Sequence, residues 1–136
     1  MREIKFKSWD TENKKWLNSV EVSAVISAHQ RGEKALLYPL MQFTGLHDKN
    51  GKEIYENDVL SVDKIASLYK NCPITVIGVV VYTNGRYEVE TKKVINKKFS
   101  EQSSIHFGMK VMDWIHLPEF HKSEIIGNIH ENPELL

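Results

Sequence analysis

The sequence is poor in several features that define particular classes of protein. Cys72 is the only cysteine in 136 residues, which excludes an intramolecular disulfide and a cysteine metal cluster. The 18 basic residues balance the 18 acidic ones, so no net charge draws nucleic acid or an anionic membrane from a distance. The longest apolar run, VIGVVVY, is too short to span a bilayer, and the charged start MREIKFKSWD lacks the apolar run of a signal peptide. The single cysteine fits a reducing cytoplasm.

The composition is sufficient for one domain with a packed core. Hydrophobic residues make up 41% of the chain and charged residues 26%, so disorder is not expected. Alternation in IKFKSW, with Ile4 and Phe6 on one face, predicts a half-buried strand, and WLNSVEV predicts the second strand of a hairpin. Further strands are predicted in LMQFTGL, KEIYENDVLSV, ITVIGVVVY, RYEVET, VMDWIHL and SEIIGNIHE. Many short strands joined by turns predict a mainly β fold with a small barrel.

The predicted turns carry asparagine and glycine, which tolerate positive φ. Asn57 and Gly85 are both expected to adopt positive φ, because each lies where a tight bend joins two apolar strands. Asp58, beside the first of these bends, is expected to accept hydrogen bonds from backbone amides. The turn residues are Asn50, Gly51, Asn57, Asp58, Asn84 and Gly85.

The hairpin that ends in RYEVET has the strongest strand pattern in the chain. Its first arm is almost wholly apolar, which is typical of a strand covered on both faces. In the second arm Tyr87 and Val89 are predicted to point inward. The positions predicted to point outward are Arg86, Glu88 and Glu90.

One or two short helices complete the predicted fold. In residues 63–71, DKIASLYKN, apolar residues recur at helical spacing, with Asp63 as a candidate N-cap and Pro73 as the end. Residues 23–39 are compatible with a short helix or an irregular segment, because Gly32 and Pro39 break any long element. Residues 92–110 show no pattern that predicts an element.

The stretch TGLHDKNGKEIYENDVL contains Gly45 and the pair Gly51-Lys52, as a phosphate-binding loop would. Five residues separate the two glycines where the Walker pattern has four, and Glu53 stands where that pattern has serine or threonine. The loop also leads into a predicted strand, so no helix N-terminus would face a phosphate. We therefore interpret the stretch as a tight turn, in which Asp48 accepts hydrogen bonds from the backbone amides ahead of it.

Three motifs carry a resemblance to a known family: LMQFTGLHDKNGKEIYENDVLSV in the middle, IIGNIHENPELL at the C-terminus and REIKFKSWD at the start. In wording and order they resemble the YopX family of phage and prophage proteins. The resemblance implies an N-terminal β-hairpin region at 1–40, an SH3-like small barrel at 41–136, a place in the host cytoplasm and no established activity. The family usually has glycine in its IYEGD turn, where this chain has Asn57, the best non-glycine residue for positive φ.

The favoured function is a non-enzymatic binding or assembly module for a protein partner or a second copy of the chain. The balanced charge predicts weak affinity for phosphates, and three tryptophans are more than a small core can hide completely. No catalytic residue, metal ion or cofactor is expected. The residues expected to contact a partner are Trp9, Trp16, Leu135 and Leu136.

Two other functions stay open. In the alternative, a nucleic-acid-binding accessory protein holds a single strand on a basic strip with aromatic rings nearby. In the third, a small hydrolase uses a histidine and a carboxylate, but the spacing of the carboxylates selects no pair. Separately, HLPEFH can bring His116, Glu119 and His121 together around a loop as a metal site, although solvated loop histidines are the favoured interpretation. The residues of the basic strip are Arg86, Lys92, Lys93, Lys97 and Lys98.

Overall fold

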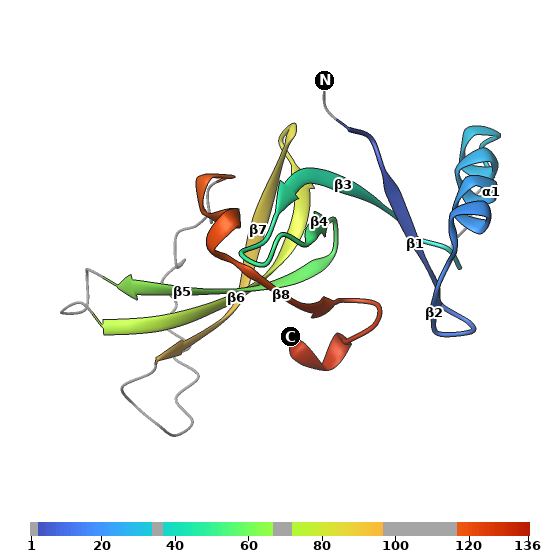
Figure 1. Ribbon diagram of the computed structural model, residues 1–136. Helices are drawn as coiled ribbons and strands as arrows, with labels where there is room; N and C mark the ends of the chain where they lie inside the picture. Colours follow the sequence, from blue (N-terminus) through green and yellow to red (C-terminus); the bar gives the residue numbers. More distant parts are fainter. Residues whose placement is uncertain (1–2, 34–36, 67–71, 97–116) are drawn as a thin grey trace.

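A computed structural model of the chain describes residues 3–33, 37–66, 72–96 and 117–136. Its strands form two four-stranded antiparallel sheets, ordered β2-β1-β3-β4 and β7-β6-β5-β8 (Figure 1). The prediction of a mainly β fold is confirmed. The elements are β1 (Phe6–Asp10), β2 (Lys15–Trp16), α1 (Ser19–Gln30), β3 (Leu40–His47), β4 (Glu53–Tyr55), β5 (Asp58–Ala66), β6 (Cys72–Thr83), β7 (Arg86–Asn96), the 3-10 helix η2 (Leu117–Lys122), β8 (Glu124–Asn128) and the 3-10 helix η3 (Pro133–Leu135).

The first sheet is built from the N-terminal hairpin, β1 and β2, together with β3 and β4. β1 pairs with the short β2, where Trp9 lies opposite Trp16, and β1 also pairs with β3 on its other side. In Figure 1, β3 runs from this sheet toward the second one, and α1 lies beside β1. Because β3 pairs with β1, residues beyond position 40 belong to the same sheet as the N-terminal hairpin.

α1 replaces the predicted second strand of the hairpin, and it makes residues 23–30, for which a short helix or an irregular segment was predicted, helical. WLNSVEV was expected to be a strand, but the strand ends at Trp16 and the helix begins at Ser19. The side chain of Asn18 accepts hydrogen bonds from the amides of Val20 and Glu21, and the Glu21 carboxylate accepts one from the amide of Asn18. This capping box satisfies backbone donors that a helix start leaves free. Among the described residues, no helix is long and apolar enough to cross a membrane.

The helix predicted over residues 63–71 is also wrong where the structure describes it. β5 continues through Asp63 to Ala66, and each of these residues pairs with β6 up to Ala66 opposite Cys72. The helical spacing of the apolar residues is therefore overridden by a continuous ladder with a neighbouring strand. Residues 67–71 lie outside the described part of the chain, as do 110–116, which hold most of the predicted strand VMDWIHL.

The β6–β7 hairpin forms as predicted. Asn84 and Gly85 close it with φ of 51° and 80°. Tyr87 and Val89 are buried as expected, but the prediction that Glu88 points outward is wrong, because its side chain is only 4% exposed. Oε1 of Glu88 accepts a hydrogen bond from the Arg86 guanidinium, whereas Oε2 is buried without a hydrogen-bond partner among the described residues.

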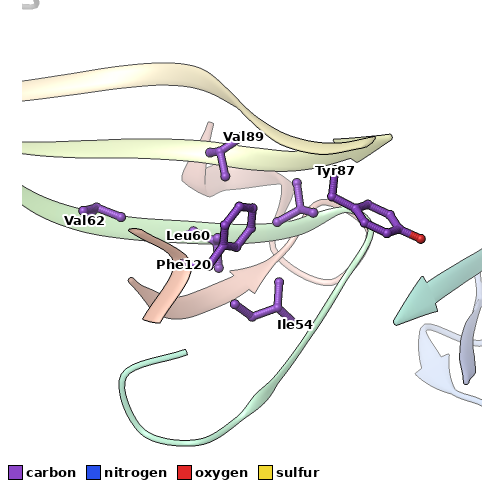
Figure 2. Close-up of a cluster of buried hydrophobic side chains, with 7 residues drawn as sticks. Ile54, Leu60, Val62, Tyr87, Val89 and Phe120 are labelled. Atoms are coloured by element: carbon purple, nitrogen blue, oxygen red, sulfur yellow. The ribbon is translucent and has the colours of Figure 1, made fainter. Parts of the chain in front are cut away.

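The main cluster of buried side chains packs against the second sheet. Leu60 and Val62 of β5, Val89 of β7 and Ile54 of β4 pack there around Phe120 of η2, which is fully buried (Figure 2). Tyr87 and Val80 complete the cluster, with Leu46 and Ile125 packed against it. Phe120 is brought in from the C-terminal quarter, so η2 closes a core that the central strands build.

The bend between β4 and β5 carries the first testable prediction. Asn57 has φ of 65°, which confirms the predicted positive φ, and its carbonyl accepts the amide of Ile129 at 3.0 Å. Asn57→Gly should leave the free energy of unfolding unchanged or slightly raised, whereas Asn57→Val should lower it by about 1–2 kcal/mol. Urea unfolding of both variants tests this, and equal stabilities would show that backbone strain at position 57 does not matter.

Candidate binding cleft between the N-terminal hairpin and the C-terminal tail

A cavity of about 320 Å³ opens where the N-terminal hairpin meets β8 and the tail that follows it. We call it the hairpin-tail cleft. Residues from both ends of the chain line it, so it forms only when the two sheets and the tail are in place. Its lining residues are Lys7, Trp16, Lys52, Asp58, Ile125, Ile126, Gly127, Asn128, Glu131 and Asn132.

The floor of the cleft is a buried ion pair between the two sheets. Nζ of Lys7, on β1, donates to Oδ1 of Asp58 on β5 at 2.5 Å, and the Asp58 side chain is only 2% exposed. Asp58 also accepts Nδ2 of Asn128 at 2.9 Å and the backbone amide of Tyr55 at 2.8 Å. The predicted role of Asp58 as an acceptor for a turn amide is confirmed, and the structure adds a link between β1, β5 and β8.

The ammonium group of Lys7 also rests on two aromatic rings. Nζ lies 4.6 Å from the ring centre of Trp16 and 4.7 Å from that of Tyr55. The Tyr55 hydroxyl donates to Oε2 of Glu53 at 2.8 Å, and burial together with that carboxylate raises the pKa of Tyr55 to about 12. Tyr55 therefore stays neutral and serves as a platform for the cation.

Trp16 forms one wall and connects the hairpin to the tail. Its ring meets that of Trp9 edge to face at 4.9 Å, and its Nε1 donates to Oε2 of Glu131 at 3.1 Å. Trp9 is only 5% exposed and is a core residue, so it offers little surface to a partner. Trp16 is half-buried and lines the cleft.

The tail packs on β8 at a glycine. A Cβ at Gly127 would lie 2.6 Å from both Oδ1 of Asn132 and Cδ1 of Leu135, so only glycine lets the tail approach this closely. The amide of Asn132 donates to the carbonyl of Asn128 at 2.7 Å. Leu135 is thus half-buried against its own chain, while Leu136 remains 49% exposed.

The turn at Gly51 uses its amides internally. Oδ1 of Asp48 accepts the amides of Asn50 at 2.8 Å and Lys52 at 2.9 Å, while Oδ2 accepts the amide of Ile125 at 3.1 Å. Gly51 has φ of 80°. These amides face a carboxylate of the chain itself, which supports the interpretation of the stretch as a tight turn.

The same carboxylate predicts a dependence of stability on pH. Burial raises the pKa of Asp48, but the amides of Ile125, Lys52 and Asn50 outweigh it, so the pKa lies below its ordinary value. A lowered folded-state pKa stabilises the protein above the unfolded pKa of about 3.9, and this contribution is lost as the pH falls through the folded value. The stability difference between wild type and Asp48→Asn should therefore be largest near neutral pH and shrink in acid.

Urea unfolding in a series of buffers from neutral pH to about pH 3 measures this difference. Glu134→Gln is the matched control, because Glu134 is exposed on η3. A difference between wild type and Asp48→Asn that is constant over the series would contradict the prediction.

The structure brings part of the predicted basic strip into ion pairs. Arg86 bonds to Glu88, and Nζ of Lys92 lies 2.8 Å from Oε1 of Glu90. Lys93 is exposed on β7. Two carboxylates inside the strip oppose binding of a polyanion. The remaining strip residues, Lys97 and Lys98, lie outside the described part of the chain.

The predicted histidine and carboxylate group is only partly visible. His121 is exposed in η2, whereas His116 and the side chain of Glu119 lie outside the described part. Among the residues that the structure describes, no group of three metal-ligating side chains is found. His130 lies near Asn57, with Nε2 3.4 Å from Nδ2, and burial lowers the pKa of His130.

These features define a class: a small, mainly β protein of two antiparallel sheets, with a charged cleft between its N-terminal hairpin and its C-terminal tail. The profile of the YopX family, described as YopX protein, matches residues 5–136, and the chain belongs to this family. The crystal structure of protein EF1440 from Enterococcus faecalis is similar over 100% of this chain and 99% of that one, with a TM-score of 0.58 and 23% identity. At that identity the likeness shows the fold alone. No curated protein matches the chain.

Proposed function

We propose that this YopX family protein is a phage or prophage protein that acts in the host cytoplasm as a non-enzymatic binding or assembly module for a protein partner. The family resemblance supports the phage origin and an SH3-like barrel in the larger C-terminal part of the chain, while β3 and β4, beyond position 40, join the sheet of the N-terminal hairpin. The hairpin-tail cleft is the binding surface in this proposal.

The observation that carries the proposal is the composition of the cleft. Ile126, which lines it, is 37% exposed, and the half-buried ring of Trp16 stands beside it. Charges of both signs surround these apolar groups, because Lys52 and Glu131 line the same cavity. Apolar side chains that lie beside charges of both signs are typical of protein-protein interfaces.

The volume fits the same partner. The cavity of about 320 Å³ is open to solvent and has room for a side chain of a partner. An anchor residue of a protein partner fills a pocket of this size.

A pull-down from host cells tests the proposal with two matched variants. Ile126→Glu places a charge in the cleft, while Val20→Glu places the same charge on α1, where Val20 is 78% exposed. We expect a protein that wild type and Val20→Glu retain and that Ile126→Glu loses. A captured protein that Ile126→Glu retains equally well would move the binding surface elsewhere.

A salt series with labelled single-stranded DNA separates the alternative. The proposed module should bind DNA weakly, whereas affinity in the micromolar range that falls steeply with salt, and that Lys92→Glu and Lys93→Glu reduce together, would favour the basic strip.

A further inference from the structure

We propose that the hairpin-tail cleft binds a second copy of this chain across a two-fold axis, with Lys52 of one subunit paired to Glu131 of the other. The inference rests on the proposed function, because it names the partner of that surface.

Two of the four charges in the cleft are already neutralised. Lys7 and Asp58 satisfy each other at 2.5 Å beneath the surface. Lys52 is exposed and forms no ion pair in the described part of the chain, although its charge acts on the Asp48 carboxylate. Glu131 is exposed too, and although its Oε2 accepts the indole of Trp16, it forms no ion pair in the described part of the chain. The cleft thus presents one cation and one anion to a partner.

Such an arrangement is complementary to itself. In a two-fold dimer the same surface patch occurs on both sides, so residue i contacts residue j and residue j contacts residue i. A patch with one charge of each sign can therefore form two identical ion pairs with a copy of itself. A patch with a single sign would repel its copy.

The apolar groups of the cleft lie at a sheet edge. Ile126 belongs to β8, which ends the order β7-β6-β5-β8 in the part of the chain that the structure describes. Leu136 is 49% exposed at the end of the tail that packs on β8. Exposed apolar side chains on an outer strand favour association with another chain. A second copy would cover Ile126 and Leu136 while its charges pair.

Sedimentation equilibrium of charge-reversal variants tests the pairing. Lys52→Glu places two carboxylates opposite each other, and Glu131→Lys places two ammonium groups opposite each other. We expect wild type to dimerise and each variant alone to dimerise at least about tenfold more weakly. An equimolar mixture should regain the wild-type affinity. A mixed dimer puts the new carboxylate at position 52 opposite the new ammonium at position 131, and native Lys52 opposite native Glu131 of the partner subunit.

Three controls separate the pair from general effects of charge. Lys93→Glu and Glu134→Lys make the same changes on β7 and on the tail and should dimerise like wild type. Glu131→Gln keeps an acceptor for the Trp16 indole without the charge, and its loss of affinity should be smaller than that of Glu131→Lys. Thermal unfolding of each variant shows whether the fold is intact.

The inference is overturned by a wild-type chain that stays monomeric at the highest concentration reached. It is overturned equally by folded charge variants that dimerise like wild type, or by a mixture that does not regain affinity. The proposed function survives these outcomes if Ile126→Glu still loses a host protein in the pull-down. It fails with the inference if neither a dimer nor a cleft-dependent partner is found.

Discussion

Asp58→Ala should destabilise the protein by about 3–5 kcal/mol, among the largest effects of any single substitution in the described part. Asp58 is the shared acceptor of Lys7 at 2.5 Å, Asn128 at 2.9 Å and the amide of Tyr55 at 2.8 Å. Removing the carboxylate leaves an ammonium group and two donors without their acceptor at a nearly buried place. The cost follows from the groups left unpaired more than from the net worth of the ion pair.

Urea unfolding at neutral pH measures the effect. Lys49→Ala is the matched control, because it breaks the exposed ion pair with Glu124 and should cost at most about 1 kcal/mol. Asp58→Asn keeps the shape but turns one acceptor into a donor that faces other donors, so it should also destabilise. A loss below about 1 kcal/mol for Asp58→Ala would show that water replaces the carboxylate and that the cleft floor is open.

The elements that sequence reasoning predicted well depend on local information. Asn84 and Gly85 lie between an apolar run and an alternating run, and this pattern specifies a hairpin without any distant contact. Asn57 is similar, since only a few residue types accept φ of 65° at low cost. Turns are therefore predictable, because residue types that accept positive φ mark them locally.

The start of helix α1 is marked in the sequence by a capping box, which the strand assigned to WLNSVEV leaves out of account. Asn18 and Glu21 have the spacing of a capping box, and this pair is the local mark of a helix start. The stretch after them is rich in valine, which favours strands. Val22 and Val25 are buried while Val20 is 78% exposed. The two buried valines are three residues apart, which places them on the same face of the helix. The capping box therefore outweighs the preference of valine for strands.

The cleft was only partly predictable, because the sequence separations that build it are large. Lys7 and Asp58 are 51 positions apart, and Trp16 and Glu131 are 115 apart. The alternation in IKFKSW places Lys7 on the face opposite Ile4 and Phe6, and nothing near Lys7 in the sequence indicates its buried acceptor. Trp16 and the tail were proposed for one surface, and the hydrogen bond between Trp16 and Glu131 places them side by side.

Gly78→Ala should also destabilise strongly, for a reason that lies in the β6–β7 ladder. Gly78 pairs with Thr91 where the register shifts by one residue, because Ile77 pairs with Lys93. A Cβ at position 78 would lie 2.5 Å from Cγ1 of Val89 and 2.7 Å from the carbonyl oxygen of Glu90. The Val89 side chain is held in the core, and the Glu90 oxygen is backbone, so neither can move away without disturbing the longest strand pair.

We expect Gly78→Ala to lower the free energy of unfolding by about 3 kcal/mol, at the upper end for overpacking, even though alanine suits a strand better than glycine. Gly127→Ala is the matched comparison. Its new methyl group meets the side chains of Asn132 and Leu135 instead of backbone, so the tail can shift and the loss should be about 1 kcal/mol or less. If the two variants proved equally stable in urea, the close approach of β7 to Gly78 would not persist in solution. Because the tail carries Glu131, Gly127→Ala should instead weaken contacts made through the hairpin-tail cleft, so the two glycines separate the stability of the sheet from the integrity of the binding surface.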